Sequence, residues 1–274
     1  MNEIQKANWL ELLVDAVNKP GRLLEAYTAF HDYSLGNALL ALSQCYSRSL
    51  TPGPLNTYKG WQTLGRQVRR GESAITLCMP ITAKRRVRVT DSIEEKYEEQ
   101  VRTMFVYRQF WFVLSQTVGD KPYVQEIPNF DIDTALQKLD ITRVEFDALC
   151  GNVQGFALRR CIAINPVAQL PYKTMFHEIA HIVLGHTGEQ QTMIDGETTP
   201  RNLREVEAES VALICCEALG LPGAEYCRGY VQHWLREAKE VPGQCAQRIF
   251  VAATAILKAG QRMPEEVACT RTNE

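Results

Sequence analysis

The sequence contains few histidines, no cysteine pair at metal-ligand spacing and no long apolar run. Histidine occurs five times in 274 residues, and none of the nine cysteines belongs to a Cys-x-x-Cys pair. An odd number of cysteines, mostly in apolar surroundings, argues against a disulfide framework and favours a reducing compartment. No uninterrupted apolar stretch approaches the roughly 18 residues of a transmembrane helix. The first 17 residues carry acids within their apolar run, unlike a signal peptide. We therefore expect a soluble, cytoplasmic protein that does not associate with a membrane.

The sequence also lacks a large net charge, but its charges are distributed unevenly. The formal net charge is -2, with 45% apolar and 23% charged residues, an ordinary balance for a globular protein. Residues 1–120 carry 15 Lys and Arg against 12 Asp and Glu, whereas residues 121–274 carry 15 against 20. Between Lys59 and Arg88, eight basic residues are opposed by Glu72 alone. Such a local excess is typical of contact with nucleic acid.

Hydrophobic periodicity predicts an α+β fold, in which a mixed α/β part precedes a mainly helical part with a small sheet. The polar, proline-containing segment 119–133 separates them, so we place two domains at residues 1–125 and 126–274. Helices are predicted at 7–24 with a break at 19–21, 23–30, 37–46, 60–69, 134–149, 175–184, 200–219, 225–239 and 242–259. Strands are predicted at 73–80, 85–89, 102–115 and 161–165, with a charged turn at 94–99 and a hairpin-like pair around 152–155.

The segment His177-Glu178-Ile-Ala-His181 fits the pattern H-E-x-x-H. On a helix, positions i and i+4 lie on one face, so both histidines can bind the same Zn²⁺. Glu178, next to the first histidine, can then act as the general base on a water molecule. The run 175–184 contains neither Gly nor Pro, which favours a helix that Gly185 ends. Two alternatives are a buried helix with hydrogen-bonded core histidines, and a metal site that does not hydrolyse peptides.

A catalytic zinc site needs a third protein ligand and an open position. His186 is a poor choice, because Gly185 takes it off the helix. The helix predicted at 200–219 carries Glu205 and Glu209 on one face, in a Glu-x-x-Ala-acid arrangement that resembles that of zincins. We expect Glu205 to be the third ligand and Glu209 to orient the free N–H of a histidine. Spacing alone does not decide between the two, and both carboxylates could instead be solvated.

The basic block mixes cations, glycines and aromatic residues, as in Tyr-Lys-Gly-Trp at 58–61 and Leu-Gly-Arg-Gln-Val-Arg-Arg-Gly-Glu at 64–72. Single-stranded nucleic acid is bound by such mixtures, because cations follow phosphates and aromatic rings stack on unpaired bases. An aromatic-rich strand at 105–112 adds to this pattern. The alternative is that Trp61 and the aromatic residues at 110–112 belong to the core, and the arginines at 66–70 to a solvated helix end.

Several motifs occur in an order that resembles ArdC-type antirestriction proteins. In the first half they are Tyr33-Ser-Leu-Gly-Asn37, Trp61-x-x-Leu-Gly-Arg-x-Val-x-x-Gly-Glu72 and Ser115-Gln-Thr-x-Gly119. In the second half they are Gly151-Asn-x-Gln-Gly155, Ile162-Ala-Ile-Asn-Pro166 and Phe176-His-Glu-Ile-Ala-His181 with Gly185-His186. In the family the Gly-His pair stands closer to the second histidine, so the intervening residues 182–184 argue against a role for His186.

The resemblance implies a bacterial protein carried by a mobile element such as a plasmid. It implies an N-terminal domain that binds single-stranded DNA and a C-terminal zincin-like metallopeptidase domain. The cofactor would be one Zn²⁺, or Mn²⁺ or another divalent metal, at His177, His181 and Glu205, with Glu178 catalytic. The protein would protect incoming conjugative DNA from host restriction, and a host restriction component is one candidate for its unknown protein substrate. The DNA-facing residues carried over are Tyr33, Asn37, Tyr58, Trp61, Arg66, Arg69 and Arg70, and more loosely residues 84–88.

Two other functions fit parts of the pattern. One is a single-stranded DNA-binding protein whose metal site is structural or inactive. The other is a DNA-replication accessory protein of the primase type, which ranks lower because the chain has no P-loop motif and no evident set of polymerase carboxylates. The hypothesis that we carry forward is a DNA-binding antirestriction protein with a zinc metallopeptidase site.

Overall fold

The computed structural model describes residues 8–89, 96–119, 123–147, 153–188, 193–194, 197–198, 201–237 and 243–262. The fold is α+β with several small sheets, as the sequence predicts. Contacts divide the chain into two compact units. The first is built from Ser43–Pro122, and the second combines Ala7–Leu42 with Tyr123–Glu274. The domain boundary at residues 125 and 126 stays a prediction.

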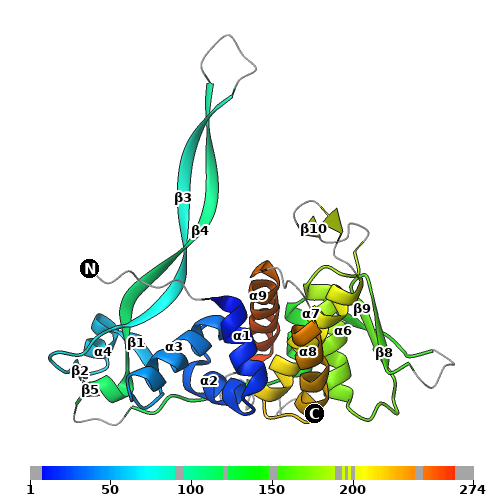
Figure 1. Ribbon diagram of the computed structural model, residues 1–274, viewed down its shortest axis with the longest axis horizontal. Helices are drawn as coiled ribbons and strands as arrows, with labels where there is room; N and C mark the ends of the chain where they lie inside the picture. The colour runs from blue at the N-terminus through cyan, green and yellow to red at the C-terminus, as the bar shows by residue number, and fades with distance from the viewer. Residues whose placement is uncertain are drawn as a thin grey trace, which may run out of the picture. The chain divides into compact units, whose positions relative to one another are not determined.

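The first unit is built around a long antiparallel ribbon. Its elements are β1 (Leu55–Thr57), α4 (Tyr58–Thr63), β2 (Gln67–Val68), β3 (Ile75–Val89), β4 (Lys96–Val113), the 3-10 helix η1 (Leu114–Gln116) and β5 (Thr117–Val118). β3 and β4 pair from Ile75 and Trp111 to Val89 and Lys96, and β1 pairs with the other edge of β4. Figure 1 shows β3 and β4 side by side as a twisted two-stranded ribbon.

Two expectations for the first unit were wrong. The predicted helix at 60–69 is the short helix α4 followed by β2, because Gly65 adopts a left-handed φ of 73° that ends the helix. The strands predicted at 73–80 and 85–89 form the single strand β3, and residues 96–99 of the predicted turn belong to β4. Residues 94 and 95 lie outside the described ranges.

The second unit is mainly helical. Its elements are α1 (Trp9–Asn18), α2 (Arg22–Phe30), the first part of α3 (Leu35–Ser47), β6 (Asn129–Phe130), α5 (Ile132–Lys138), β7 (Thr142–Arg143), β8 (Gly155–Leu158), β9 (Cys161–Ile164), α6 (Pro171–Val183), β10 (Met193–Ile194), β11 (Glu197–Thr198), α7 (Arg201–Ala218), α8 (Ala224–Glu237), α9 (Gly243–Ala259) and β12 (Gln261–Arg262). Helix α7 packs against α6, α8 and α9 (Figure 1), and β8 and β9 pack against α6. None of the described helices is long and apolar enough to cross a membrane.

The predicted helix at 134–149 is also wrong, since α5 ends at Lys138. Asp140 adopts a left-handed φ of 54°, and the β-branched residues after it lead into β7. The predicted strand at 161–165 is β9, and it pairs antiparallel with β8, while residue 152 of the expected hairpin lies outside the description. The other predicted helices of this half correspond to α6 to α9, although α6 begins at Pro171 rather than at 175, and positions 200, 238–239 and 242 are not described. Within the described ranges every cysteine is a free thiol.

Candidate metal centre and nucleic-acid face

Helix α6 presents its histidines beside a buried apolar face. Phe176, Ile179 and Ala180 are fully buried, and their spacing of three and four residues places them on the core side. Pro171 stands at the first position of the helix, where its missing N–H costs nothing. Gly185, with φ 77°, ends the helix in a left-handed turn. His177 and His181 therefore lie one turn apart on the same helix face, as the sequence predicts.

The structure brings His177, His181 and Glu205 together. The two imidazole Nε2 atoms lie 3.1 Å apart. Glu205 Oε2 lies 3.5 Å from the Nε2 of His177 and 3.7 Å from the Nε2 of His181. Ligand atoms of a tetrahedral zinc site, with bonds of about 2.0–2.1 Å, are separated by roughly 3.4 Å. The three measured separations bracket that value, so these side chains fit a divalent cation at their centre.

The pKa values of the two histidines show what a cation would replace. Burial alone would lower the pKa of His177, but hydrogen bonds with Glu205 and Glu209 outweigh it and raise the pKa to about 9. Burial and the neighbouring charge of His177 lower the pKa of His181 to about 4. At neutral pH His177 therefore carries a proton on Nε2, which lies 3.5 Å from Glu205 Oε2 and 3.1 Å from the Nε2 of His181. A metal ion bound between them would have to displace that proton.

Glu209 supports the first histidine. Its Oε2 lies 2.9 Å from His177 Nδ1, and its Oε1 lies 2.9 Å from Lys173 Nζ. Burial would raise the pKa of Glu209, but the His177 hydrogen bond and the Lys173 charge lower it to about 2. Glu209 is therefore a carboxylate that accepts the Nδ1 proton of His177 and leaves Nε2 toward Glu205. Sequence spacing could not decide which of Glu205 and Glu209 lies with the two histidine Nε2 atoms, and in the structure it is Glu205.

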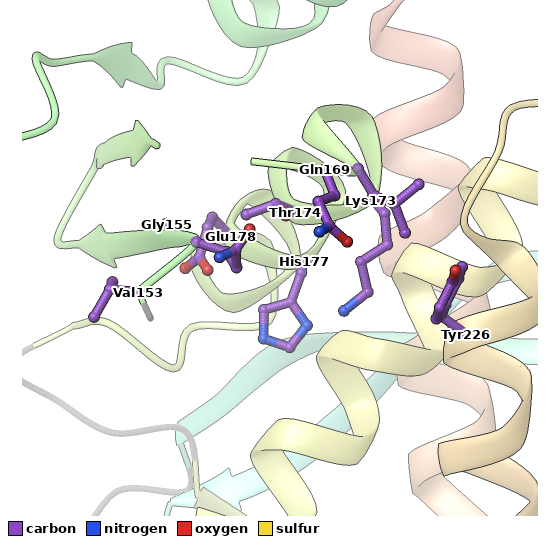
Figure 2. A pocket seen from close by; sticks show the side chains of 10 residues that line it. Val153, Gly155, Gln169, Lys173, Thr174, His177, Glu178 and Tyr226 are labelled. Carbon is purple, nitrogen blue, oxygen red and sulfur yellow. The ribbon is translucent and has the colours of Figure 1, made fainter. Parts of the chain in front are cut away.

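Glu178 is buried beside the ligand group and lines two adjoining cavities. Its pKa is raised, chiefly by burial. Cavities of about 430 Å³ and about 450 Å³ share Gly155, His177 and Glu178 in their walls. Figure 2 shows Glu178 on the side of Gly155 and Lys173 on the side of Tyr226, with His177 between them. A carboxylate with a raised pKa in a cleft is suited to accept and return a proton.

The contacts of the His186 side chain were not predicted from the sequence. Its Nδ1 lies 3.0 Å from His181 Nδ1, and its Nε2 lies 3.0 Å from Glu207 Oε2. His186 lies outside the group of donor atoms formed by His177, His181 and Glu205. The left-handed turn at Gly185 nevertheless folds the chain back, and His186 N–H donates to the carbonyl of His181 at 2.7 Å. In the sequence, the glycine directly after the helix was the feature that could have predicted that the chain turns back toward His181.

The predicted DNA-facing residues occupy different surroundings. Tyr33 and Asn37 belong to the second unit, and the other five to the first. Trp61 is 1% exposed and donates its Nε1–H to Phe112 O at 2.7 Å, so it is a core residue and offers no ring face to a base. The Nε of Arg66, a half-buried residue, donates to Thr117 Oγ1 at 2.8 Å.

Three of the predicted residues do meet around one cavity. Tyr58, Arg69 and Arg70 line a space of about 620 Å³, together with Phe112 and Val118. Arg69 is paired with Glu72 at 2.7 Å. On the ribbon, Phe105 and Phe110 are more than half exposed, and Lys84 is exposed. The side chains of residues 85–88 are outside the description.

Residues 3–112 match the family described as the N-terminal domain of anti-restriction factor ArdC. No curated protein sequence matches the chain.

Two crystal structures of the antirestriction ArdC protein from plasmid R388 are similar to this chain, each at 19% identity. The metal-free structure has a TM-score of 0.49 and covers 92% of this chain and 94% of the plasmid protein. The Mn(II)-bound structure has a TM-score of 0.50 and covers 97% and 99%. At this identity the second comparison shows a shared fold.

Proposed function

We propose that this chain, whose residues 3–112 match the N-terminal domain family of anti-restriction factor ArdC, is an ArdC-type antirestriction protein that binds single-stranded DNA and hydrolyses peptide bonds at a divalent metal. In this proposal the metal is held by His177, His181 and Glu205, and the protein protects incoming conjugative DNA from host restriction. The observation that carries the proposal is the triangle of three donor atoms, 3.1, 3.5 and 3.7 Å apart, beside the buried Glu178.

The donor set suits a divalent transition metal. Two imidazoles and one carboxylate are the ligands of many catalytic zinc sites, and they also suit Mn²⁺. The similar plasmid protein has been crystallised with Mn(II), which supports a divalent metal and leaves Zn²⁺ as a proposal. When bound, such an ion supplies Lewis-acid polarisation of a carbonyl and of a water molecule.

The remaining steps belong to residues of this chain. Glu178 takes a proton from the attacking water and returns it to the leaving amine. Strand β8 stands at the edge of the described sheet β7-β9-β8, and Gly155, Phe156 and Ala157 line the cavity. The free backbone edge of such a strand can hydrogen-bond an extended peptide. Arg204, a cation in the same cavity wall, can stabilise negative charge that develops on the scissile carbonyl.

For single-stranded DNA, the cavity at Tyr58 combines the groups that such a ligand needs. Tyr58 offers an exposed ring for stacking, and the exposed Arg69 and Arg70 offer cations for phosphates. Because the contact would be largely ionic, affinity for DNA should fall as salt concentration rises.

The two activities can be tested in one experiment with Glu178→Ala. Purified wild-type protein and the variant are analysed for bound metal, for hydrolysis of a casein-type protein substrate and of a peptide library, and for electrophoretic shifts of single- and double-stranded oligonucleotides. We expect metal and a single-strand preference in both proteins, and hydrolysis only in the wild type. Equal hydrolysis by the variant would contradict the role of Glu178, and metal binding without any hydrolysis would indicate a site without peptidase function. Equal, salt-insensitive shifts of both DNA forms would exclude the DNA proposal.

A further inference from the structure

A buried chain of polar contacts leads away from His181, on the side opposite to the ligand triangle. His181 Nδ1 lies 3.0 Å from His186 Nδ1, and His186 Nε2 lies 3.0 Å from Glu207 Oε2. The side chains of His186 and Glu207 are 1% and 0% exposed. Arg248 of α9 closes the chain, with its Nη2 3.3 Å from Glu207 Oε2.

Burying this group of polar and charged side chains costs free energy compared with apolar packing, which indicates a role other than stability. A fully buried carboxylate must be paired, and apolar residues of similar volume often fill such a place at lower cost. Arg248 Nε lies 3.2 Å from Glu207 Oε1, close enough for an ion pair but not aligned as a hydrogen bond. Arg248 also donates to Leu184 O at 3.3 Å, so α9, α7 and the end of α6 converge on Glu207.

The donor and acceptor groups along this chain of contacts determine which histidine nitrogen carries a proton. The Arg248 guanidinium only donates, and the Glu207 carboxylate only accepts. His186 therefore donates from Nε2–H to Glu207, which leaves its Nδ1 as an acceptor. His181 then donates from Nδ1–H to His186, and its own Nε2 carries the lone pair. That lone pair lies on the side of His177 and Glu205, where a metal ligand needs it.

We propose that His186 and Glu207 are positioning residues that hold His181 in the tautomer and orientation of a metal ligand. The inference rests on the metal site of the proposed function. It gives the two histidine ligands matching supports: Glu209 with its cation Lys173 acts directly on His177, and Glu207 with its cation Arg248 acts on His181 through His186. Loss of such a partner typically lowers metal affinity about 10–100-fold.

The matched pair Glu207→Gln and Glu217→Gln tests the proposal. Glu217 lies on the same helix α7, is also buried, and is paired with Arg228, while its Oε1 accepts the N–H of Leu23 at 3.3 Å. Each variant removes one buried, paired carboxylate from α7. We expect the affinity for Zn²⁺ and Mn²⁺, measured by chelator competition and calorimetry, to fall at least about tenfold in Glu207→Gln and to stay at the wild-type value in Glu217→Gln. Equal affinities in wild type and Glu207→Gln, or equal losses in both variants, would overturn it.

A second readout does not depend on any variant folding. In ¹⁵N-labelled, Zn²⁺-loaded wild-type protein, ring correlations of the five histidines report which nitrogen carries each proton. The proposal requires Nδ1–H on His181 and Nε2–H on His186, and an Nδ1–H on His186 would overturn it.

Two variants of His186 provide a third test. His186→Gln, which can still accept and donate a hydrogen bond, should retain part of the metal affinity that His186→Phe loses, and equal loss in both variants would count against the proposal. A wild-type protein that binds no metal would instead refute the proposed function and is recognised in the same titration.

Discussion

Two aromatic residues three positions apart have opposite environments and should respond oppositely to mutation. Tyr58 is 42% exposed beside Arg69, whereas Trp61 is buried and hydrogen-bonded to Phe112 O. We expect Tyr58→Ala to weaken single-stranded DNA binding about 5–150-fold, the range for loss of one stacked base, at an unchanged melting temperature. Trp61→Phe should lower the free energy of unfolding by about 1–3 kcal/mol through a lost hydrogen bond and a cavity, and leave DNA affinity unchanged. Fluorescence anisotropy and thermal unfolding measure the two effects.

Tyr172 supplies the control for this prediction. It is also 42% exposed, but it lies at the start of α6, in the second unit. Tyr172→Ala should bind DNA as the wild type does. A similar loss of affinity in both tyrosine variants would mean that the cavity at Tyr58 is not the binding face.

At the candidate metal centre, the sequence spacing predicted one part of the site, and the packing of the helices determines the other. The helix period places His177 and His181 on one face without any further information. The distinction between Glu205 and Glu209 needs the distance and orientation of two helices, which spacing within α7 does not contain. The contact between His186 and His181 was missed for a related reason. It depends on the left-handed turn at Gly185 and on a carboxylate 21 residues away.

Strand β8 reaches α6 so closely that only glycine fits at its first position. A Cβ on Gly155 would lie 2.8 Å from Thr174 Cγ2 and 2.9 Å from the carbonyl oxygen of Ala163. Since a backbone oxygen of the paired strand cannot move aside easily, Gly155→Ala should displace β8. We expect a loss of about 1–3 kcal/mol in the free energy of unfolding and a higher KM for peptide, with the metal still bound. Denaturant unfolding and steady-state kinetics check both.

Gly229 in α8 is the matched glycine. No atom lies within 4 Å of the place its Cβ would occupy, and it stands inside a helix. Gly229→Ala should therefore raise the free energy of unfolding by about 0.5–1 kcal/mol without changing KM. If both alanines destabilised the protein equally, close approach of β8 to α6 would not be the cause.

Elements with a long, uniform pattern could be predicted, and short or turn-dominated ones could not. The apolar spacing in α6, α8 and α9 continues over several turns. The predicted ranges of α8 and α9 agree with the structure where it describes them, whereas α6 begins at Pro171, four residues before its predicted start. The segments 60–69 and 134–149 also contain apolar residues at helical spacing, but Gly65 and Asp140 adopt positive φ values within them. A single left-handed residue ends a helix that the pattern alone would continue.

Contacts between distant parts of the chain left no signal in the sequence. Trp9 and Phe250 meet with ring centroids 6.2 Å apart, and Arg228 donates to Ala16 O at 3.3 Å. These contacts join α1 to α8 and α9, within a unit that also contains the candidate metal centre. Composition and charge suggested two parts of the chain, but only packing shows which segments associate.

Metal binding should stabilise the protein in a pH-dependent way. In the metal-free fold the pKa of His177 is raised to about 9, above the usual value of about 6.5. This group stabilises the metal-free fold fully below pH about 6.5, and its contribution is lost as pH rises toward about 9. Bound metal needs His177 without that proton, so the apparent affinity should rise about tenfold, or ~1.4 kcal/mol, per pH unit between these values. With Zn²⁺ in excess, the gain in melting temperature should therefore be larger at pH 8 than at pH 7.

His177→Ala is the control for that measurement, because it removes both the competing proton and one ligand. The melting temperature of this variant should respond little to Zn²⁺ at either pH. Calorimetry in buffers of different ionisation enthalpy adds a direct count, since binding at pH 7 should release about one proton for each metal ion. A metal-induced gain that is independent of pH, or binding without proton release, would contradict the raised pKa of His177 and its place among the metal ligands.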